Sequence, residues 1–165
     1  MLNALSAPHF GDEEPPYPGT CRPEPGAKIQ EIIEGEDVHW RFRVPQGEEL
    51  AFHDLAHGEQ RAVAGEDFGD FIVWRRDDVP AYQLAVVVDD AAMEITEVVR
   101  GSDLLLSTFR QLLLFRALGL KEPAFYHAPL VLDPETGERL AKRHAALSLR
   151  QLRAMGADPK LLLEE

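Results

Sequence analysis

Two stretches that are typical of buried strands flank a long helical pattern in the second half of the sequence. The first run is EITEVVRG (94–101), and the second is AFYHAPLVL (124–132). Between them, TFRQ (108–111) matches a capping box, which predicts a helix that starts there and ends at Gly119. A buried strand, a helix and a second buried strand in this order are typical of parallel strands joined by a crossover. The order therefore predicts an α/β fold with a parallel sheet.

Other segments predict further elements on both sides of this unit. YQLAVVVDD (82–90) has a helical spacing of its apolar positions, which favours a helix despite the β-preference of its three valines. Before it, KIQEII, VHWRFRV and DFIVWRR are separated by the turn signals PQGEE and HGEQ, and predict strands of a small sheet within 28–76. LSLRQLRAM (147–155) predicts a last helix closed by Gly156. Residues 1–27 are rich in Pro, Gly and acid, which predicts a loop.

The length of 165 residues suits one domain with a single core. Cys21 is the only cysteine, so no internal disulfide can form and a multi-thiolate metal site would need other ligands. No run approaches the roughly 18 apolar residues of a membrane span, and LNALSAPHF after Met1 does not resemble an export signal. We therefore expect no membrane partner and a cytoplasmic location.

A basic stretch stands out in a chain whose formal net charge is -12. Residues 137–153 hold five Lys or Arg, and Glu138 is their only acid. The stretch is either a solvated basic helix face or a place where anions bind. Lys142, flanked by Arg139 and Arg143, lies in a loop where a mobile cation could meet charge developing on a phosphate. The sequence has no Walker-type glycine loop, which excludes a P-loop NTPase.

Three other positions could carry chemistry. Arg100 ends a predicted strand just before a helix, where ligands of α/β proteins bind, and its guanidinium could form a fork with a carboxylate. An ion pair with Asp103 or Asp89 is the structural alternative. Tyr82 could direct its hydroxyl at a ligand or be an amphipathic core residue with its tip in water.

His53 and His57 have the spacing of two zinc ligands on one helical turn. The segment is short, however, and no third ligand is placed nearby in the sequence. Ordinary surface histidines near a strand end are therefore the favoured interpretation.

Several long motifs, taken in order, resemble one family. They are YPGTCR, GDFIVWRRDD, AYQLAVVVDDAAMEITEVVRGSDLLLSTFRQ, YHAPLVLDPETGERLAKR and HAALSLRQLR. They are similar to the later half of the glutamyl-queuosine tRNA(Asp) synthetases, paralogues of the glutamyl-tRNA synthetases that keep the class I catalytic domain. The resemblance covers the chain from about residue 4. It implies a Rossmann-like α/β catalytic domain with a small β-rich segment near its N-terminus.

The resemblance also implies roles for individual residues. Arg139, Leu140, Ala141, Lys142 and Arg143 match the KMSKS-type loop, whose lysine would contact ATP, used with Mg²⁺, as L-glutamate is converted to its adenylate. Tyr82 and Arg100 match positions that bind glutamate. Tyr17 and Cys21 match the last two of four Zn²⁺ ligands. The implied domain division is 1–27, the remainder of a zinc-binding insertion, and 28–165, the C-terminal part of the catalytic domain.

Two departures from the family pattern lie within the chain, and one lies before it. Ala141 replaces the serine that usually precedes the loop lysine, and Phe109 replaces a proline at an expected helix start, at a small expected cost. The HIGH-type motif and the first two zinc ligands have no counterpart in the sequence. We therefore expect little activity from the chain alone, with a separate chain supplying the N-terminal half as one candidate partner. The alternative is a non-catalytic remnant that binds tRNA(Asp) or a partner protein.

Overall fold

The structure is a computed structural model that describes residues 17–20, 22, 38–130, 149–156 and 158. The chain divides into two compact units, Met1–Ala128 and Pro129–Glu165, each of which is described by itself. The division expected from the family resemblance, at residue 27, stays a prediction.

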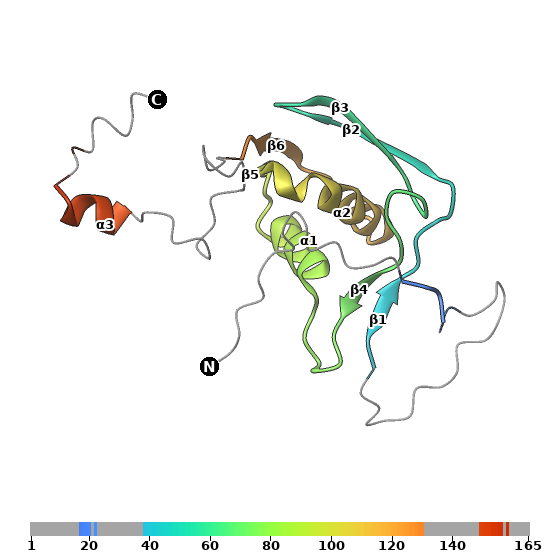
Figure 1. The fold of residues 1–165 in the computed structure, drawn as a ribbon. Coiled ribbons are helices and arrows are strands. Elements are labelled where there is room, and N and C mark those ends of the chain that lie inside the picture. Colours follow the sequence, from blue (N-terminus) through green and yellow to red (C-terminus); the bar gives the residue numbers. More distant parts are fainter. Residues whose placement is uncertain (1–16, 21, 23–37, 131–148, 157, 159–165) are drawn as a thin grey trace. The chain divides into compact units, whose positions relative to one another are not determined.

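The first unit contains a mixed four-stranded sheet (Figure 1). Its strands are β2 (Glu49–Asp54), β3 (Gly58–Val63), β5 (Glu97–Gly101) and β6 (Ala124–Ala128), in the spatial order β3-β2-β6-β5. Strands β2 and β3 form an antiparallel hairpin, whereas β6 runs parallel to both β2 and β5. The predicted α/β organisation and the predicted parallel pair are confirmed, but β2 and β3 were not anticipated as separate strands.

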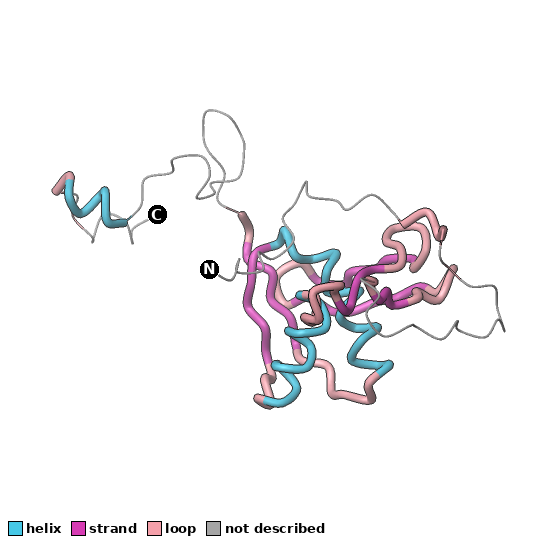
Figure 2. The backbone as a smooth tube through the Cα atoms, turned by 90° about the horizontal axis from the view of Figure 1, so that it is seen from below, coloured by secondary structure: helices cyan, strands magenta, loops and turns pink. Residues whose placement is uncertain are grey.

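Two helices pack against each other in the same unit, as Figures 1 and 2 show. Helix α1 (Tyr82–Ala92) confirms the prediction from helical spacing. Helix α2 (Leu105–Ala117) connects β5 to β6 and follows directly on a 3₁₀ turn, η1 (Ser102–Leu104).

The predicted capping box at 108–111 is wrong. Because η1 passes directly into α2, the helix has already begun at Leu105, and Thr108 lies inside it. The Thr108 hydroxyl is 3.4 Å from the carbonyl of Leu104, four residues back, rather than at a free N–H of a helix start. The helix end was predicted correctly: Gly119 has a φ of 66°, the left-handed conformation that glycine adopts readily after a helix.

The parallel strands β5 and β6 are buried on one face only, which corrects the prediction that both are buried strands. In β6, Phe125 and His127 are buried, whereas Tyr126 between them is 37% exposed. In β5, Val99 is 64% exposed. Alternate side chains of a strand point to opposite faces, so one face of this pair contacts the core and the other does not.

A separate two-stranded antiparallel sheet joins β1 (Trp40–Phe42) to β4 (Phe71–Trp74). These strands confirm the predictions from VHWRFRV and DFIVWRR. The strand predicted for KIQEII lies outside the described residues.

Aromatic side chains from the sheet and from α2 form much of the core. Phe109 is 2% exposed, and its ring lies 5.1 Å from that of Phe52 and 6.3 Å from that of Phe68. Phe52 also contacts the ring of Phe125 at 5.8 Å. Phe109 is therefore a core residue within α2, not a residue at a helix start where a substitution costs little.

The second unit contains α3 (Leu149–Ala154) among its described residues. The chain turns at Gly156, which has a φ of 79° and donates its N–H to the carbonyl of Arg153 at 3.1 Å. The predicted last helix and its glycine stop are confirmed. Within the described part of the chain, no helix is long and apolar enough to cross a membrane.

Candidate active site

Arg100 and His127 are paired positions on the parallel strands β5 and β6. The register of β5 and β6 places Arg100 opposite His127 and Val98 opposite Phe125. Since residues two apart share a face, Arg100 lies on the same face as the buried Phe125 and His127. A charged side chain is thereby held next to the carboxyl ends of two parallel strands, where ligands of α/β proteins commonly bind.

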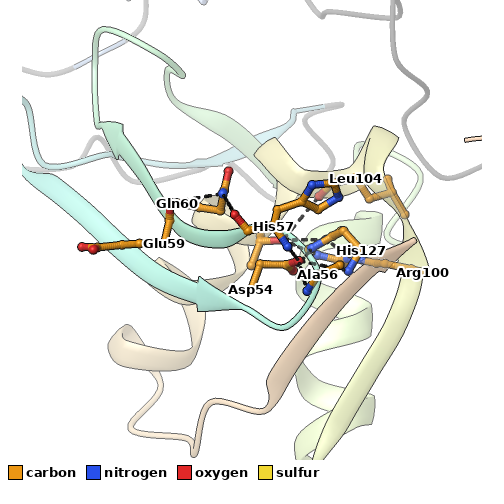
Figure 3. A network of polar contacts seen from close by, with 9 residues as sticks. Asp54, Ala56, His57, Glu59, Gln60, Arg100, Leu104 and His127 are labelled. Atoms are coloured by element: carbon orange, nitrogen blue, oxygen red, sulfur yellow. Dashed lines mark hydrogen bonds and ion pairs between the residues drawn. The ribbon is translucent and has the colours of Figure 1, made fainter. Parts of the chain in front are cut away.

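Neutral groups hold the guanidinium of Arg100 through hydrogen bonds. Its Nε donates to Nε2 of His127 at 3.1 Å, and its Nη2 donates to Oγ1 of Thr108 at 2.8 Å. Its central carbon lies 5.4 Å from the centre of the Phe125 ring, within the range of a cation–π contact. Figure 3 shows Arg100 directed at His127, with Asp54 on the far side of the imidazole.

Burial lowers the pKa of the Arg100 guanidinium, and several neighbours oppose this effect. A charge interaction and a hydrogen bond with the Tyr82 side chain raise the pKa, as do the charges of Asp90 and Asp103. We expected Asp103 or Asp89 to interact with Arg100. The charge of Asp103 does raise the pKa of the guanidinium, and the second contributing acid is Asp90 rather than Asp89. Burial in turn raises the pKa of Asp90, which the charge of Arg100 partly offsets. A guanidinium remains cationic at neutral pH in these surroundings.

Asp54 and His127 form a fully buried pair beside Arg100. Oδ2 of Asp54 lies 2.6 Å from Nδ1 of His127, and neither side chain is exposed to solvent. Oδ1 of Asp54 accepts the backbone N–H groups of Ala56 and His57 at 3.0 and 2.9 Å, in the turn after β2. The carboxylate is thus held by its own turn as well as by the imidazole.

The pKa shifts of this pair favour an ionised acid and a neutral imidazole. Burial raises the pKa of the Asp54 carboxyl, but hydrogen bonds from His127 and from backbone N–H groups outweigh it and lower the pKa to about 2. Burial lowers the pKa of His127, the hydrogen bond to Asp54 raises it, and the positive charge of Arg100 lowers it, with a net decrease.

The structure brings together two of the residues predicted from the sequence. Tyr82, the first residue of α1, and Arg100, in β5, are adjacent through their side chains. The Tyr82 side chain is half-buried and its interaction with Arg100 raises the pKa of the guanidinium. Both alternatives for Tyr82, a hydroxyl directed at a ligand and a core residue with its tip in water, stay predictions. The KMSKS-type loop at 139–143, including Lys142, lies outside the described residues.

The expected zinc ligands are described only in part, because Cys21 lies outside the described residues. The Tyr17 ring has the guanidinium of Arg41 at 4.4 Å from its centre. In the part of the chain that the structure describes, no group of three or more His, Cys, Asp and Glu could hold a metal ion. Tyr17 and Cys21 would provide two ligands, and tetrahedral structural zinc takes four. A zinc site here is not supported.

The spacing of His53 and His57 does not reflect a helical turn. His53 lies in strand β2 and His57 lies in the turn that follows, so a helical face does not unite them. Both side chains are exposed.

Sequence reasoning missed Asp54, Thr108 and His127 as parts of the site. A histidine inside the otherwise apolar run AFYHAPLVL was the signal that could have identified one of them. A buried polar side chain needs a partner, so such a residue indicates a second polar group from another strand.

Comparisons with known proteins identify the family of the chain. Residues 11–165 match the family described as tRNA synthetases class I (E and Q), catalytic domain. The chain is 52% identical over 165 residues to a glutamyl-Q tRNA(Asp) synthetase of Symbiobacterium thermophilum, covering 99% of this chain and 50% of that protein. It is 42% identical over 156 residues to a glutamate–tRNA ligase of Leptothrix cholodnii, covering 94% of this chain and 33% of that protein.

A solved structure with a similar fold is a glutamate tRNA ligase from Elizabethkingia meningosepticum in complex with its amino acid. The TM-score is 0.58 at 33% identity, over 62% of this chain and 20% of that protein. The chain spans about half the length of the glutamyl-Q tRNA(Asp) synthetases that it matches. The resemblance stated from the sequence motifs is confirmed, and the chain belongs to the class I (E and Q) tRNA synthetase family, within the catalytic domain.

Proposed function

We propose that this chain forms the glutamate-recognition part of an ATP-dependent enzyme that activates L-glutamate and transfers it to the queuosine of tRNA(Asp). The observation that carries the proposal is the Arg100 guanidinium, which His127 and Thr108 hold beside the carboxyl ends of β5 and β6. A planar guanidinium suits a carboxylate because two parallel N–H groups meet two oxygens. The glutamyl-Q tRNA(Asp) synthetases that the chain resembles support the acceptor tRNA.

The proposed chemistry needs a carboxylate held beside a triphosphate. An oxygen of the glutamate α-carboxylate attacks the α-phosphorus of ATP, a new O–P bond forms, and the bond to the departing pyrophosphate breaks. Lys142, in the KMSKS-type loop, would stabilise the negative charge that builds on the phosphate oxygens, and Mg²⁺ would accompany the ATP. Arg100 and Tyr82 would hold the amino acid during this step.

A calorimetric titration with L-glutamate tests the recognition step directly. We expect the chain to bind L-glutamate, and Arg100→Lys to weaken binding at least about tenfold, because an ammonium cannot form the planar fork. The matched control is Arg61→Lys, an exposed arginine in β3 that pairs with Glu49 and Glu59, where affinity should not change. Equal affinities of the Arg100→Lys variant and the original chain would contradict the proposed site.

The role of Lys142 needs a separate assay. Glutamate-dependent exchange of pyrophosphate into ATP should be weak with the chain alone and should increase when a related protein's N-terminal half is added. Lys142→Ala should then reduce the exchange strongly. Binding of tRNA without any binding of glutamate or ATP would instead favour the non-catalytic alternative.

A further inference from the structure

Asp54 determines which ring nitrogen of His127 carries the proton, and this in turn determines whether His127 can accept a hydrogen bond from Arg100. An ionised carboxylate can only accept hydrogen bonds, so Nδ1 of His127, at 2.6 Å from Oδ2, must carry the proton. In a neutral imidazole the other nitrogen then has a lone pair. Nε2 of His127 is therefore an acceptor. The Nε–H of Arg100 points at it at 3.1 Å, and the Thr108 hydroxyl lies at the same distance from it.

The edge of the Arg100 guanidinium that carries Nε and Nη2 is consequently held by hydrogen bonds. Its Nε–H bonds to His127 and its Nη2 bonds to Thr108, while the Phe125 ring lies beside its central carbon. A guanidinium has five N–H donors in a rigid plane, so these contacts set the plane without using all of its donors. Binding of a carboxylate by such a fork depends on that plane being set in advance.

We propose that Asp54 and His127 act as a positioning pair that holds the Arg100 guanidinium in the orientation that binds the substrate carboxylate. The inference rests on the proposed function for its ligand, glutamate. Asp54 acts through the tautomer of the imidazole. If the proton moved to Nε2, two N–H groups would face each other at 3.1 Å and Arg100 would lose this contact.

Asp54→Asn is the decisive variant because asparagine has nearly the same shape as aspartate. The backbone N–H groups of the turn after β2 decide which way its amide faces. Oδ1 of residue 54 accepts the N–H groups of Ala56 and His57, so the oxygen of an asparagine would stay there and its NH₂ would face His127. That NH₂ would donate to Nδ1, and the ring proton would move to Nε2. Nitrogen-15 NMR of the imidazole distinguishes the two tautomers.

Two results are expected together. The original chain should carry its His127 proton on Nδ1, whereas Asp54→Asn should carry it on Nε2 and bind L-glutamate roughly tenfold more weakly. Asp67→Asn is the matched control, because Asp67 is an exposed aspartate that accepts a backbone N–H from Val63. It should change neither the tautomer nor the affinity.

The double variant Asp54→Asn with His127→Gln separates the tautomer from general damage to the structure. A glutamine can turn its oxygen toward Arg100 whatever residue 54 donates, so this variant should recover most of the lost affinity. A loss that persists in the double variant, while it remains folded, would contradict the proposal.

The proposal remains testable if the variants do not fold, since a proton on Nε2 in the original chain would overturn it outright. So would Asp54→Asn with unchanged glutamate affinity. If the original chain does not bind glutamate at all, the proposed function fails. The exchange protection of the Arg100 Nε–H then decides the positioning role alone: it should fall in Asp54→Asn, and unchanged protection would overturn the inference.

Discussion

Gln111 donates a hydrogen bond of 2.8 Å to Oε1 of Gln83, and this contact joins α2 to α1 inside the protein. Gln83 in turn donates to the hydroxyl of Ser107 at 3.1 Å. The side chains of the three residues are buried, at 7% exposure or less. Gln83 follows Tyr82 directly, so the hydrogen bonds among Gln111, Gln83 and Ser107 also hold the start of α1, where the proposed substrate site lies.

Gln83→Leu should lower the free energy of unfolding by about 1–3 kcal/mol, because it leaves the Gln111 and Ser107 groups buried without this partner. Adding Gln111→Leu should cost less than the sum of the two single changes. Urea unfolding followed by circular dichroism measures all three variants. Arg116→Ala is the control: it breaks an exposed ion pair with Glu122, and should cost below about 1 kcal/mol. Strict additivity of the two glutamine changes would contradict this interpretation.

Sequence patterns predicted the elements that depend on neighbouring residues. The spacing of apolar positions indicated α1, and short stretches typical of buried strands indicated β5 and β6. They could not indicate the contact between Asp54 and His127, because the two residues are 73 positions apart. No local pattern encodes a hydrogen bond between two strands.

The start of α2 shows a different kind of failure. TFRQ fits a capping box by residue type, yet η1 begins the helical turn at Ser102 and leaves Thr108 inside the helix. Its hydroxyl is used instead by Arg100, from the preceding strand. Tertiary contact therefore decided the role of a residue whose local sequence suggested another.

Acid should destabilise the chain in two stages. The pKa of His127 is lowered below its ordinary 6.5, so the unfolded chain binds the proton more readily and stability should fall as the pH drops below about 6.5. The pKa of Asp54 is lowered from 3.8 to about 2, so its contribution of about 2 kcal/mol is present above pH 3.8 and is lost as the pH falls toward 2.

Urea unfolding between pH 7 and pH 2 measures both stages. Asp54→Asn should be less stable at pH 7 and should lack the second stage, because an amide does not titrate in this range. Stability that stays constant from pH 7 to pH 4 would contradict the assignment of a neutral, buried His127.

Phe109→Ala should be among the most damaging single changes in the core. The ring is 2% exposed and contacts Phe52 and Phe68, so its removal leaves a cavity between α2 and the sheet side chains. A loss of about 3–5 kcal/mol in the free energy of unfolding is expected. Leu118→Ala, at a residue that is 49% exposed, should cost far less. Similar losses for the two variants in chemical denaturation would show that Phe109 does not anchor the core.

Thr108 provides the most direct test of the contacts that hold Arg100. Its Oγ1 accepts the Nη2 donor of Arg100 at 2.8 Å, and the residue is completely buried. Thr108→Val keeps the shape of the side chain and removes the acceptor, so a charged donor loses its partner. Glutamate affinity should fall roughly tenfold. Thr108→Ser keeps the hydroxyl and loses only a methyl group, so calorimetric titration should show nearly the original affinity, with a modest loss of thermal stability. If serine and valine weaken glutamate binding equally, the packing of the methyl group rather than the hydrogen bond positions the guanidinium.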